Sequence, residues 1–456
     1  MGIEWREFRF EELLEIPLRN GIYKKKEFHG SGSRIVNMGE LFAYPRLFDV
    51  PMKRVELDEK DRQNALLEEG DLLFARRSLT AEGAGKCSIV KEVCEETTFE
   101  SSLIRARPNK KTALPDYLYY FFDSPQGRHL IGTILRQVAV SGITGTDLKQ
   151  LKIPLPSLCR QRSVSDILAS LDDKIALNHQ INTTLESMAQ ALFKSWFVDF
   201  DPVIDNALAA GNPIPETLKA RADARAALGD QRKPLPDHIR QQFPDRFVQT
   251  EEMGWVPEGW IVGSFNDIAL QVRSNAKTEE IASNDFYVGL EHIGRKQFFL
   301  SDYGNGSSVE SNKSRFQRSD LLFGKLRPYF HKVCQAPFDG VCSTDILVFR
   351  SKEPLHNSFM YMTAYREDFV EYANACSTGT RMPRANAKDL LTFAVVIPPG
   401  KLREAFEDLT APNWDKGVAG VRESESLSKL RDTLLPKLLS GELRVPEAEM
   451  KLAEIL

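Results

Sequence analysis

The chain contains two copies of one sequence pattern, and this duplication constrains the fold more than any other feature. The segment Gly70–Phe74 (GDLLF) recurs as Ser319–Phe323 (SDLLF), 249 residues further on. Leu155-Pro156 closes the first copy, and Ile397-Pro398 closes the second. The spacing is too long for a solenoid repeat and is typical of a duplicated domain. Each copy is followed by a helical pattern, so the chain is suited to contacting two similar sites at a fixed distance.

The bulk composition is that of an ordinary globular protein with room for several cores. A length of 456 residues predicts two to four domains, and the hydrophobic fraction of 42% with 27% charged residues is unremarkable for that class. The net charge of −4 does not favour nucleic-acid binding, which usually needs a basic surface. A local basic face balanced by acidic surface elsewhere is still compatible with it.

The cysteines and the hydropathy pattern predict a cytoplasmic protein without a metal site. The six cysteines form no C-x-x-C pair, and the best metal spacing, His331 and Cys334 with Cys342, lacks a fourth ligand. Scattered thiols without a signal peptide are typical of the cytoplasm. No apolar run reaches the ~18 residues of a membrane helix, so we expect no membrane association.

Both copies follow the same order of expected elements, which predicts an α+β class with two similar domains. An aromatic residue leads into a short helix, then strands with alternating apolar residues, a helical stretch rich in aromatics, a polar loop and a closing strand. The expected short helices are at 5–16 and 260–272. The expected strands are at 34–41, 87–93, 99–106, 286–293 and 341–350, and the expected helices at 115–130 and 355–373. The loops are expected at 139–146 and 375–386, with Asp147-Leu148 and Asp389-Leu390 starting the closing strands.

The stretch 160–200 has the clearest helical pattern in the chain. Apolar residues recur at spacings of three and four, interrupted by Asn178 and Asn182, as in a coiled-coil seam whose polar positions fix register. A single helix packed on its own domain is the alternative, but about forty residues without Pro or Gly exceed the usual 8–20. The stretch 201–249 is rich in proline and predicts a partly ordered connector with a short helix at 216–228.

A second helical region is predicted from about 401 to 439, in a less regular form. We expect interruptions at Pro412 and at Gly417 and Gly420, a resumed helix at 421–434, a kink or end at Pro436, and a stop at Gly441. The residues predicted for the coiled coil and for subunit contacts are Leu168, Leu171, Ile175, Asn178, Asn182, Leu185, Met188, Leu192, Phe193, Trp196, Phe197, Leu427, Leu430, Leu434 and Leu438.

No catalytic motif stands out, whereas DNA-reading side chains are duplicated. The chain has no phosphate-binding loop, nucleophile elbow or zinc-protease motif. Arginine can read guanine, Asn and Gln adenine, and Ser or Thr bases or phosphates. The candidate DNA-binding residues are Arg76, Arg77, Lys86, Arg136, Gln137, Ser141, Thr144 and Thr146 in the first copy, and Lys325, Arg327, Ser377, Thr378, Thr380, Arg381, Arg384 and Asn386 in the second. Simple solvation explains any one of these cations equally well, but the two sets together favour DNA.

The segments outside the recognition loops resemble the specificity subunits of Type I restriction-modification enzymes. The resemblance is carried by Ile153–Pro156, Leu171–Ile175, Leu185–Phe200 (LESMAQALFKSWFVDF), Pro257–Trp260 and Leu430–Leu443 (LRDTLLPKLLSGEL). It spans essentially the whole chain. One departure is that the second helical region lacks the Gln-Arg opening of the first, so the pairing of the two helices is expected to be asymmetric.

The resemblance implies a DNA reader without catalysis or cofactors of its own. Each domain would read one half of a split, asymmetric double-stranded target, and the two helices would pack antiparallel as a spacer of up to ~60 Å. Two modification subunits would bind S-adenosylmethionine and methylate adenine N6. Restriction subunits would add ATP- and Mg-dependent translocation and cleavage.

This interpretation divides the chain into recognition domains at 1–156 and 251–398, conserved helices at 157–200 and 399–445, a connector at 201–250 and a tail at 446–456. Three alternatives stay open. The first is a coiled-coil scaffold with two interaction domains that do not bind DNA. The second is an orphan subunit of a methylation-only complex, and the third is a fused enzyme with a divergent site.

Overall fold

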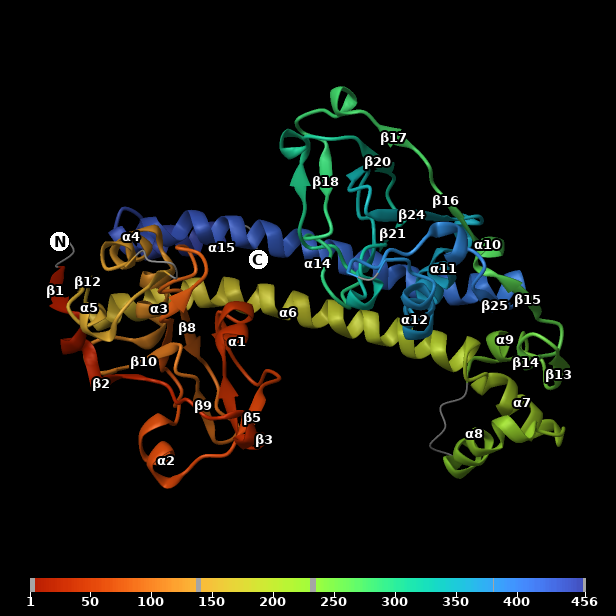
Figure 1. Cartoon of the computed structure of the whole chain (residues 1–456), viewed down its shortest axis with the longest axis horizontal. Coiled ribbons are helices and arrows are strands. Elements are labelled where there is room, and N and C mark those ends of the chain that lie inside the picture. The colour runs from red at the N-terminus through yellow and green to blue at the C-terminus, as the bar shows by residue number, and fades with distance from the viewer. Residues whose placement is uncertain (1–4, 137–140, 230–234, 380, 454–456) are drawn as a thin grey trace. The chain divides into compact units, whose positions relative to one another are not determined.

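The computed structural model describes residues 5–136, 141–229, 235–379 and 381–453. It divides into two compact units, one formed by Met1–Lys174 with Leu427–Leu456 and the other by Ile175–Ser426. We call them unit 1 and unit 2. Both boundaries between the units fall inside the two long helices of the chain (Figure 1), so each unit contains a part of each helix. In the described part of the chain, no helix is both long and apolar enough to cross a membrane.

Unit 1 contains a mixed sheet with the strand order β2-β10-β6-β8-β4 and a smaller sheet with the order β5-β3-β9. Both β6 (sequence LLFA) and β8 (sequence CSIV) are completely buried. The elements are β1 (Arg6–Arg9), β2 (Leu14–Asn20), β3 (His29–Val36), α1 (Met38–Ala43), β4 (Arg46–Leu47), β5 (Lys53–Val55), α2 (Glu59–Ala65), β6 (Leu72–Ala75), β7 (Arg77–Ser78), β8 (Cys87–Val90), β9 (Thr97–Phe99), β10 (Leu103–Pro108), α3 (Pro115–Asp123), α4 (Pro125–Thr133), β11 (Ser141–Gly142), α5 (Gly145–Leu148) and β12 (Lys152–Leu155).

Unit 2 repeats this plan with the strand orders β16-β24-β21-β22 and β17-β20-β23-β18-β19. In both units the first and last strands of the copy pair with each other, β1 with β12 and β15 with β25, so the copy begins and ends at one place. The elements are β15 (Ile261–Ser264), α10 (Phe265–Ile268), β16 (Ala269–Gln271), β17 (Asn275–Ala276), β18 (Phe286–Val288), β19 (Gly304–Asn305), β20 (Lys313–Phe316), β21 (Leu321–Gly324), β22 (Val333–Gln335), β23 (Gly340–Cys342), β24 (Ile346–Ser351), α11 (Asn357–Tyr365), α12 (Glu367–Ala375), α13 (Ala387–Leu390) and β25 (Ala394–Ile397).

A buried ion pair is duplicated at the start of the repeated strand. Arg107 donates to both carboxylate oxygens of Asp71 at 2.7 and 2.9 Å, and Arg350 does the same to Asp320 at 2.6 and 2.8 Å. Both aspartates are almost fully buried. Burial of such a carboxylate is tolerated because a bidentate guanidinium hydrogen bond replaces the hydrogen bonds that the carboxylate makes to water in the unfolded chain. The Asp of the DLLF motif therefore has a structural role in both copies.

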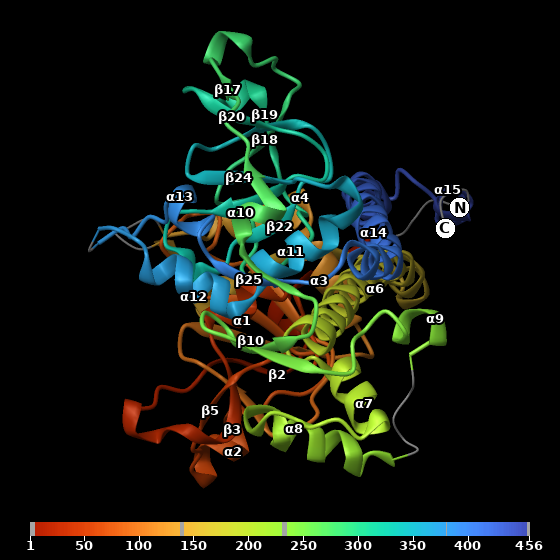
Figure 2. The same ribbon diagram turned by 90° about the vertical axis from the view of Figure 1, so that its right-hand side faces the viewer.

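The predicted helix at 160–200 is confirmed as α6 (Leu158–Phe197), and it packs antiparallel on α14 (Gly400–Ser440) in each unit (Figure 2). In unit 1, Arg431 of α14 donates to Asp172 of α6 at 2.7 Å. In unit 2, Asn178 donates to Glu423 at 2.8 Å and Asn182 to the Gly417 carbonyl at 3.2 Å. The mixed α+β class and the paired long helices are thus as predicted.

The predicted interruptions of α14 are wrong, because the helix is continuous through Pro412, Gly417, Gly420 and Pro436 and ends only at Ser440, before Gly441 with φ of 79°. The glycines are packing positions. A Cβ on Gly417 would lie 2.1 Å from the Phe299 ring, and one on Gly420 would lie 3.4 Å from the Asn182 side chain. Small residues there let other side chains approach the helix backbone, which compensates for their poor helix propensity.

The predicted seam residues fall into three groups by exposure. The buried members are Leu168, Leu171, Asn178, Asn182, Leu185, Phe193, Trp196, Phe197, Leu427, Leu434 and Leu438, and the half-buried members are Ile175, Leu192 and Leu430. Met188 is 56% exposed and lies outside the seam within this chain. Phe193 and Phe197 stack edge-on against Phe406 of α14, so aromatic packing fixes this part of unit 2.

Several predicted boundaries need correction. The helices expected at 5–16 and 260–272 are single turns between strands, and each aromatic helical stretch is two helices, α3 with α4 and α11 with α12. Asp147-Leu148 and Asp389-Leu390 end the short helices α5 and α13 instead of starting the closing strands. The cause is local. Thr144 and Asn386 cap these helical turns, so β12 and β25 begin a few residues later than predicted.

The connector is more ordered than predicted. The expected helix at 216–228 is α8 (Glu216–Ala227), but α7 (Asp201–Ala210), α9 (Asp237–Arg240) and the hairpin β13 (Phe247–Thr250) with β14 (Gly254–Pro257) accompany it. Arg221 clamps Asp201 with bonds of 2.8 and 2.7 Å, which joins α8 to α7. At the other end of the chain, α15 (Val445–Ala453) follows α14.

Candidate nucleic-acid interface

In unit 1 the basic end of the repeated strand lies beside the polar loop. Strand β7, which holds Arg77, pairs antiparallel with β11, which begins at Ser141. The backbone N–H of Ile143 donates to the carbonyl of Arg76 at 3.0 Å. Two segments about 65 residues apart in sequence are therefore joined by backbone hydrogen bonds. The structure thus brings together the two parts of the first candidate set.

Unit 2 makes the same junction with different side chains. The N–H of Ala385 donates to the Lys325 carbonyl at 2.9 Å, and the N–H of Arg327 donates to the Pro383 carbonyl at 2.8 Å. The Ala385–Lys325 bond is the counterpart of the Ile143–Arg76 bond in unit 1. We call each of these edges, where the strand end meets the polar loop, a cationic edge. Conserved backbone geometry with variable side chains suits two readers of different sequences.

Some of the candidate cations are held by carboxylates of their own unit. Arg136 pairs with Asp147 at 2.7 Å, and in unit 2 Arg384 and Lys325 lie 3.5 and 4.0 Å from Asp345. These pairs are partly exposed, so each contributes little to stability and can exchange a carboxylate for a phosphate. Asp345 is a site residue that sequence reasoning missed, because an aspartate at a strand start gives no signal of its partners.

Arg77 and Arg381 are the most available cations of the two edges. Both side chains are exposed, and among the described residues neither has a carboxylate within ion-pair distance. Lys86 is less available. Its ammonium lies 5.3 Å from the centre of the Phe42 ring, and burial, with Arg128 nearby, lowers its pKa. Arg76 is half-buried at the junction itself.

Several of the predicted polar readers have local structural bonds. The Thr144 hydroxyl accepts the Asp147 N–H at 3.2 Å and donates to its carboxylate, so it caps α5. The Asn386 side chain accepts the Lys388 N–H at 3.0 Å and caps α13, and the Ser377 hydroxyl donates to the Ala373 carbonyl. The Thr-x-x-Asp spacing is a capping signature that indicated this role. Thr146 and Thr378 are exposed and Ser141 half-buried, while Gln137 and Thr380 lie outside the described residues.

A turn with a strained backbone borders the cationic edge of unit 2. The single helical turn Pro328–Phe330 lies between Arg327 and His331, whose φ angles are 52° and 50°. Left-handed conformations in such side chains cost on the order of 1 kcal/mol or more each and gather at functional sites. The guanidinium of Arg295 lies 3.9 Å from the Phe330 ring centre, a cation–π contact that holds the turn.

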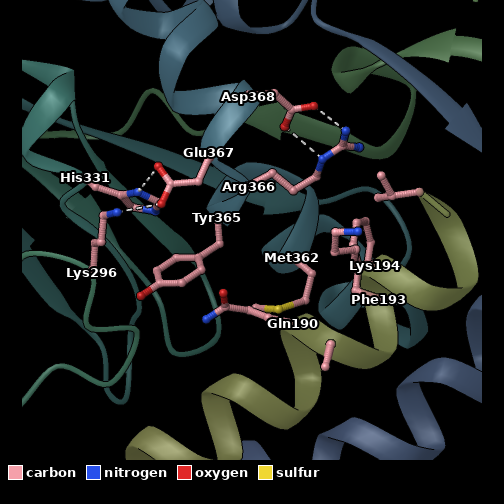
Figure 3. A pocket seen from close by; sticks show the side chains of 12 residues that line it. Gln190, Phe193, Lys194, Lys296, His331, Met362, Tyr365, Arg366, Glu367 and Asp368 are labelled. Atoms are coloured by element: carbon pink, nitrogen blue, oxygen red, sulfur yellow. Dashed lines mark hydrogen bonds and ion pairs between the residues drawn. The ribbon is translucent and has the colours of Figure 1, made fainter.

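Unit 2 also contains a cavity of about 540 Å³ between α6 and α12 (Figure 3). Two ion pairs lie in its lining: Lys296 bonds Glu367 at 2.6 Å, and Arg366 bonds Asp368 at 2.8 Å. Lys194 pairs with Asp199 outside the lining. His331 lines the cavity wall, and burial lowers its pKa. The described residues of the lining include no Ser, Thr or Cys that a neighbouring base could activate as a nucleophile.

The histidine and cysteines with the best metal spacing do not form a metal site. No group of His, Cys, Asp or Glu with metal-binding geometry occurs among the residues that the structure describes. Cys334 and Cys342 lie in the apolar core of unit 2, where burial raises the pKa of both thiols. Raising the pKa disfavours the thiolate that a zinc ion requires.

Comparison with known proteins gives one consistent result. Residues 2–187 match the family model described as the Type I restriction modification DNA specificity domain. The HindI specificity subunit of Haemophilus influenzae is 25% identical over 83% of this chain and 87% of its own length. The MjaIX specificity subunit of Methanocaldococcus jannaschii is 25% identical over 74% of this chain and 71% of its own length. The solved S subunit of M. genitalium covers 96% of both chains with a TM-score of 0.50 and 13% identity, a likeness of fold alone.

The duplicated sheet-and-helix units, the paired long helices and these matches define a class: proteins that recognise DNA sequence for restriction-modification systems. The family model, both relatives and the solved structure are all specificity subunits or domains of Type I restriction-modification enzymes, and together they support the same identification for this chain. The resemblance inferred from the central and C-terminal motifs is thereby confirmed.

Proposed function

We propose that this chain reads a two-part DNA target, with one half-site for each cationic edge, and that partner subunits carry out the chemistry. The recognition domains are residues 1–156 and 251–398. The main support is the duplicated junction, in which the same backbone bond joins a basic strand end to a polar loop in both units. Duplicated geometry with different side chains is the arrangement expected for two readers of unlike half-sites.

The candidate residues divide into two roles under this proposal. Exposed Arg77 and Arg381 read base edges, because a free guanidinium can bond two acceptors of guanine in the major groove. Arg136, Arg384 and Lys325, which lie near carboxylates, contact phosphates by exchanging partners. Thr144 and Asn386 shape the loops and make no base contact.

The conserved helices 157–200 and 399–445 set the length of the unread spacer and present the surface for two modification subunits. In this proposal those subunits bind S-adenosylmethionine, flip the target adenine out of the duplex and methylate it. Restriction subunits with ATP and Mg complete the enzyme, and the complex works in the cytoplasm on double-stranded DNA.

The experiment that tests the proposal is a methylation map. The chain is co-expressed with the modification subunit from its own operon in a host free of DNA methylation, and N6-methyladenine is located by sequencing. We expect a motif with two fixed parts and a constant unread gap. A complex that assembles but leaves no such motif contradicts the proposal.

The assignment of half-sites is tested by Arg381→Ala, with Arg77→Ala as the matched variant in the other unit. Each loss should relax one part of the motif by about 1–3 kcal/mol of discrimination and leave the other part intact. Equal weakening of both parts by either variant contradicts the division of labour between the units.

The scaffold alternative predicts a different response to salt. A DNA reader loses affinity steeply as salt rises, because each neutralised phosphate releases counterions. The affinity of the assembled complex for DNA is measured between about 50 and 200 mM salt. An affinity that does not change over this range supports the scaffold instead.

A further inference from the structure

We propose that Leu79 in unit 1 and Tyr329 in unit 2 are apolar contacts to the bases, one for each half-site. The inference rests on the proposed function and adds a type of contact that no Arg, Ser or Thr of the cationic edges provides. Each side chain lies in the loop that follows the repeated strand, directly beside the junction with the polar loop.

The position in unit 1 is defined by its exposure and its neighbours. Leu79 is 92% exposed, which is more than any other large apolar side chain among the described residues. It follows Ser78, whose strand β7 pairs with β11 of the polar loop. The loop is built to hold this conformation: the Ser78 hydroxyl accepts the Thr80 N–H at 3.2 Å, and the Thr80 hydroxyl accepts the Gly83 N–H at 3.2 Å.

The position in unit 2 lies in the corresponding loop, one residue further from the repeated strand, because Tyr329 is six residues after Phe323 and Leu79 is five after Phe74. Tyr329 is 53% exposed in the turn that follows β21, while its neighbour Pro328 is buried. The backbone of Arg327 bonds the polar loop at Pro383, so the turn is attached to the cationic edge. The Tyr329 ring stands edge-on against Phe330, with 4.7 Å between ring centres.

Exposed apolar side chains are common singly, so exposure alone carries no meaning. Here the same loop of two diverged copies exposes a large apolar side chain in both, beside the candidate cations, and unit 2 maintains backbone strain at Arg327 and His331 on either side of it. Strain of this kind is maintained when the position of a side chain matters. Such side chains contact thymine methyl groups or enter between bases in a groove.

The test uses the full chain in its complex with the modification subunit and DNA duplexes carrying the mapped motif. We expect Tyr329→Ala to weaken specific binding by about fivefold or more, the lower end of what truncating a base-stacking side chain costs. Leu79→Ala should weaken it by about fivefold or more as well, because it removes a leucine side chain buried against the bases. The loss should be confined to base pairs of one half-site. The salt dependence of binding should stay unchanged, because an apolar side chain neutralises no phosphate.

Leu355→Ala is the matched control in unit 2. Leu355 is 67% exposed but follows the opposite end of the sheet, since Leu321 pairs with Phe349 there while Gly324 pairs with Ile346 at the cationic edge. This variant should bind like the unaltered complex. A loss equal to that of Tyr329→Ala overturns the inference, as does wild-type affinity for both loop variants.

Duplexes with uracil in place of thymine separate the two possible base contacts. If a methyl group is the partner, uracil weakens the unaltered complex at one base pair, and the alanine variant no longer responds to that replacement. If the side chain enters between bases, uracil has no effect and both alanine variants still lose affinity. If the unaltered complex has no two-part specificity, the proposed function fails. If both alanine variants keep the affinity and specificity of the unaltered complex, only the apolar contacts are refuted.

Discussion

Replacing Gly417 with alanine tests whether close packing, and not chain breaking, explains the glycines of α14. The new Cβ would lie 2.1 Å from two carbons of the Phe299 ring, whereas carbon atoms in contact sit about 3.5–4.0 Å apart. Phe299 is 6% exposed and packs near Trp414, so the ring has little room to move. Overpacking of this kind costs about 2–3 kcal/mol.

The opposing effect is the higher helix propensity of alanine. Its size relative to the cost of overpacking decides whether the substitution stabilises or destabilises the helix. Alanine is better than glycine inside a helix by about 1 kcal/mol. The net expectation for Gly417→Ala is a loss of about 1–2 kcal/mol of local stability. Gly420→Ala is the matched control, because its Cβ would lie 3.4 Å from the nearest atom, the side-chain oxygen of Asn182. There the propensity gain prevails, and we expect a stabilisation of up to about 1 kcal/mol.

Hydrogen exchange followed by mass spectrometry reads the peptides of α14 in unit 2 separately from the rest of the chain. Gly417→Ala should exchange about 5–30-fold faster there, and Gly420→Ala up to about fivefold more slowly. The double variant Gly417→Ala with Phe299→Leu should recover part of the loss, since the shorter side chain vacates the overlap. Slower exchange in Gly417→Ala, equal to that in Gly420→Ala, would refute the packing argument.

Further predictions concern buried charges. Glu186 accepts the N–H groups of Phe298 and Phe299 at 2.9 and 3.3 Å, so Glu186→Ala should lower the free energy of unfolding of unit 2 by about 1–3 kcal/mol in urea denaturation, while Glu186→Gln keeps an acceptor and should lose much less. Burial raises the pKa of Glu186, so the native state binds this proton more tightly than the unfolded chain does. The contribution of Glu186 to stability should therefore fall as pH rises from about 4.5 through the raised pKa. If Glu186→Gln leaves the pH profile of stability unchanged, this expectation is contradicted. Arg350→Leu leaves the Asp320 carboxylate buried without its cation and should cost about 3 kcal/mol, with Arg107→Leu giving a similar loss in unit 1; near-wild-type urea midpoints for both would show that the duplicated pair is dispensable.

The sequence alone predicted the features that depend on local periodicity and on repetition. The duplicated DLLF motif predicted two similar domains, and the long apolar repeat of 160–200 predicted α6 to within three residues at either end. It also placed Asn178 and Asn182 in the helix seam, where both are buried and bonded to α14. These succeed because helix period and domain duplication are properties of neighbouring residues and of whole segments.

Only the tertiary structure decided the features in which a distant contact overrides a local preference. Gly417 and Gly420 carry the local signal of a helix break, yet α14 continues because Phe299 and the asparagines of α6 occupy the space beside them. The junction of Arg76 with Ile143, and of Lys325 with Ala385, joins segments far apart in the chain. Such pairings depend on which backbone groups the folded sheet leaves facing each other, and no spacing within one segment encodes that.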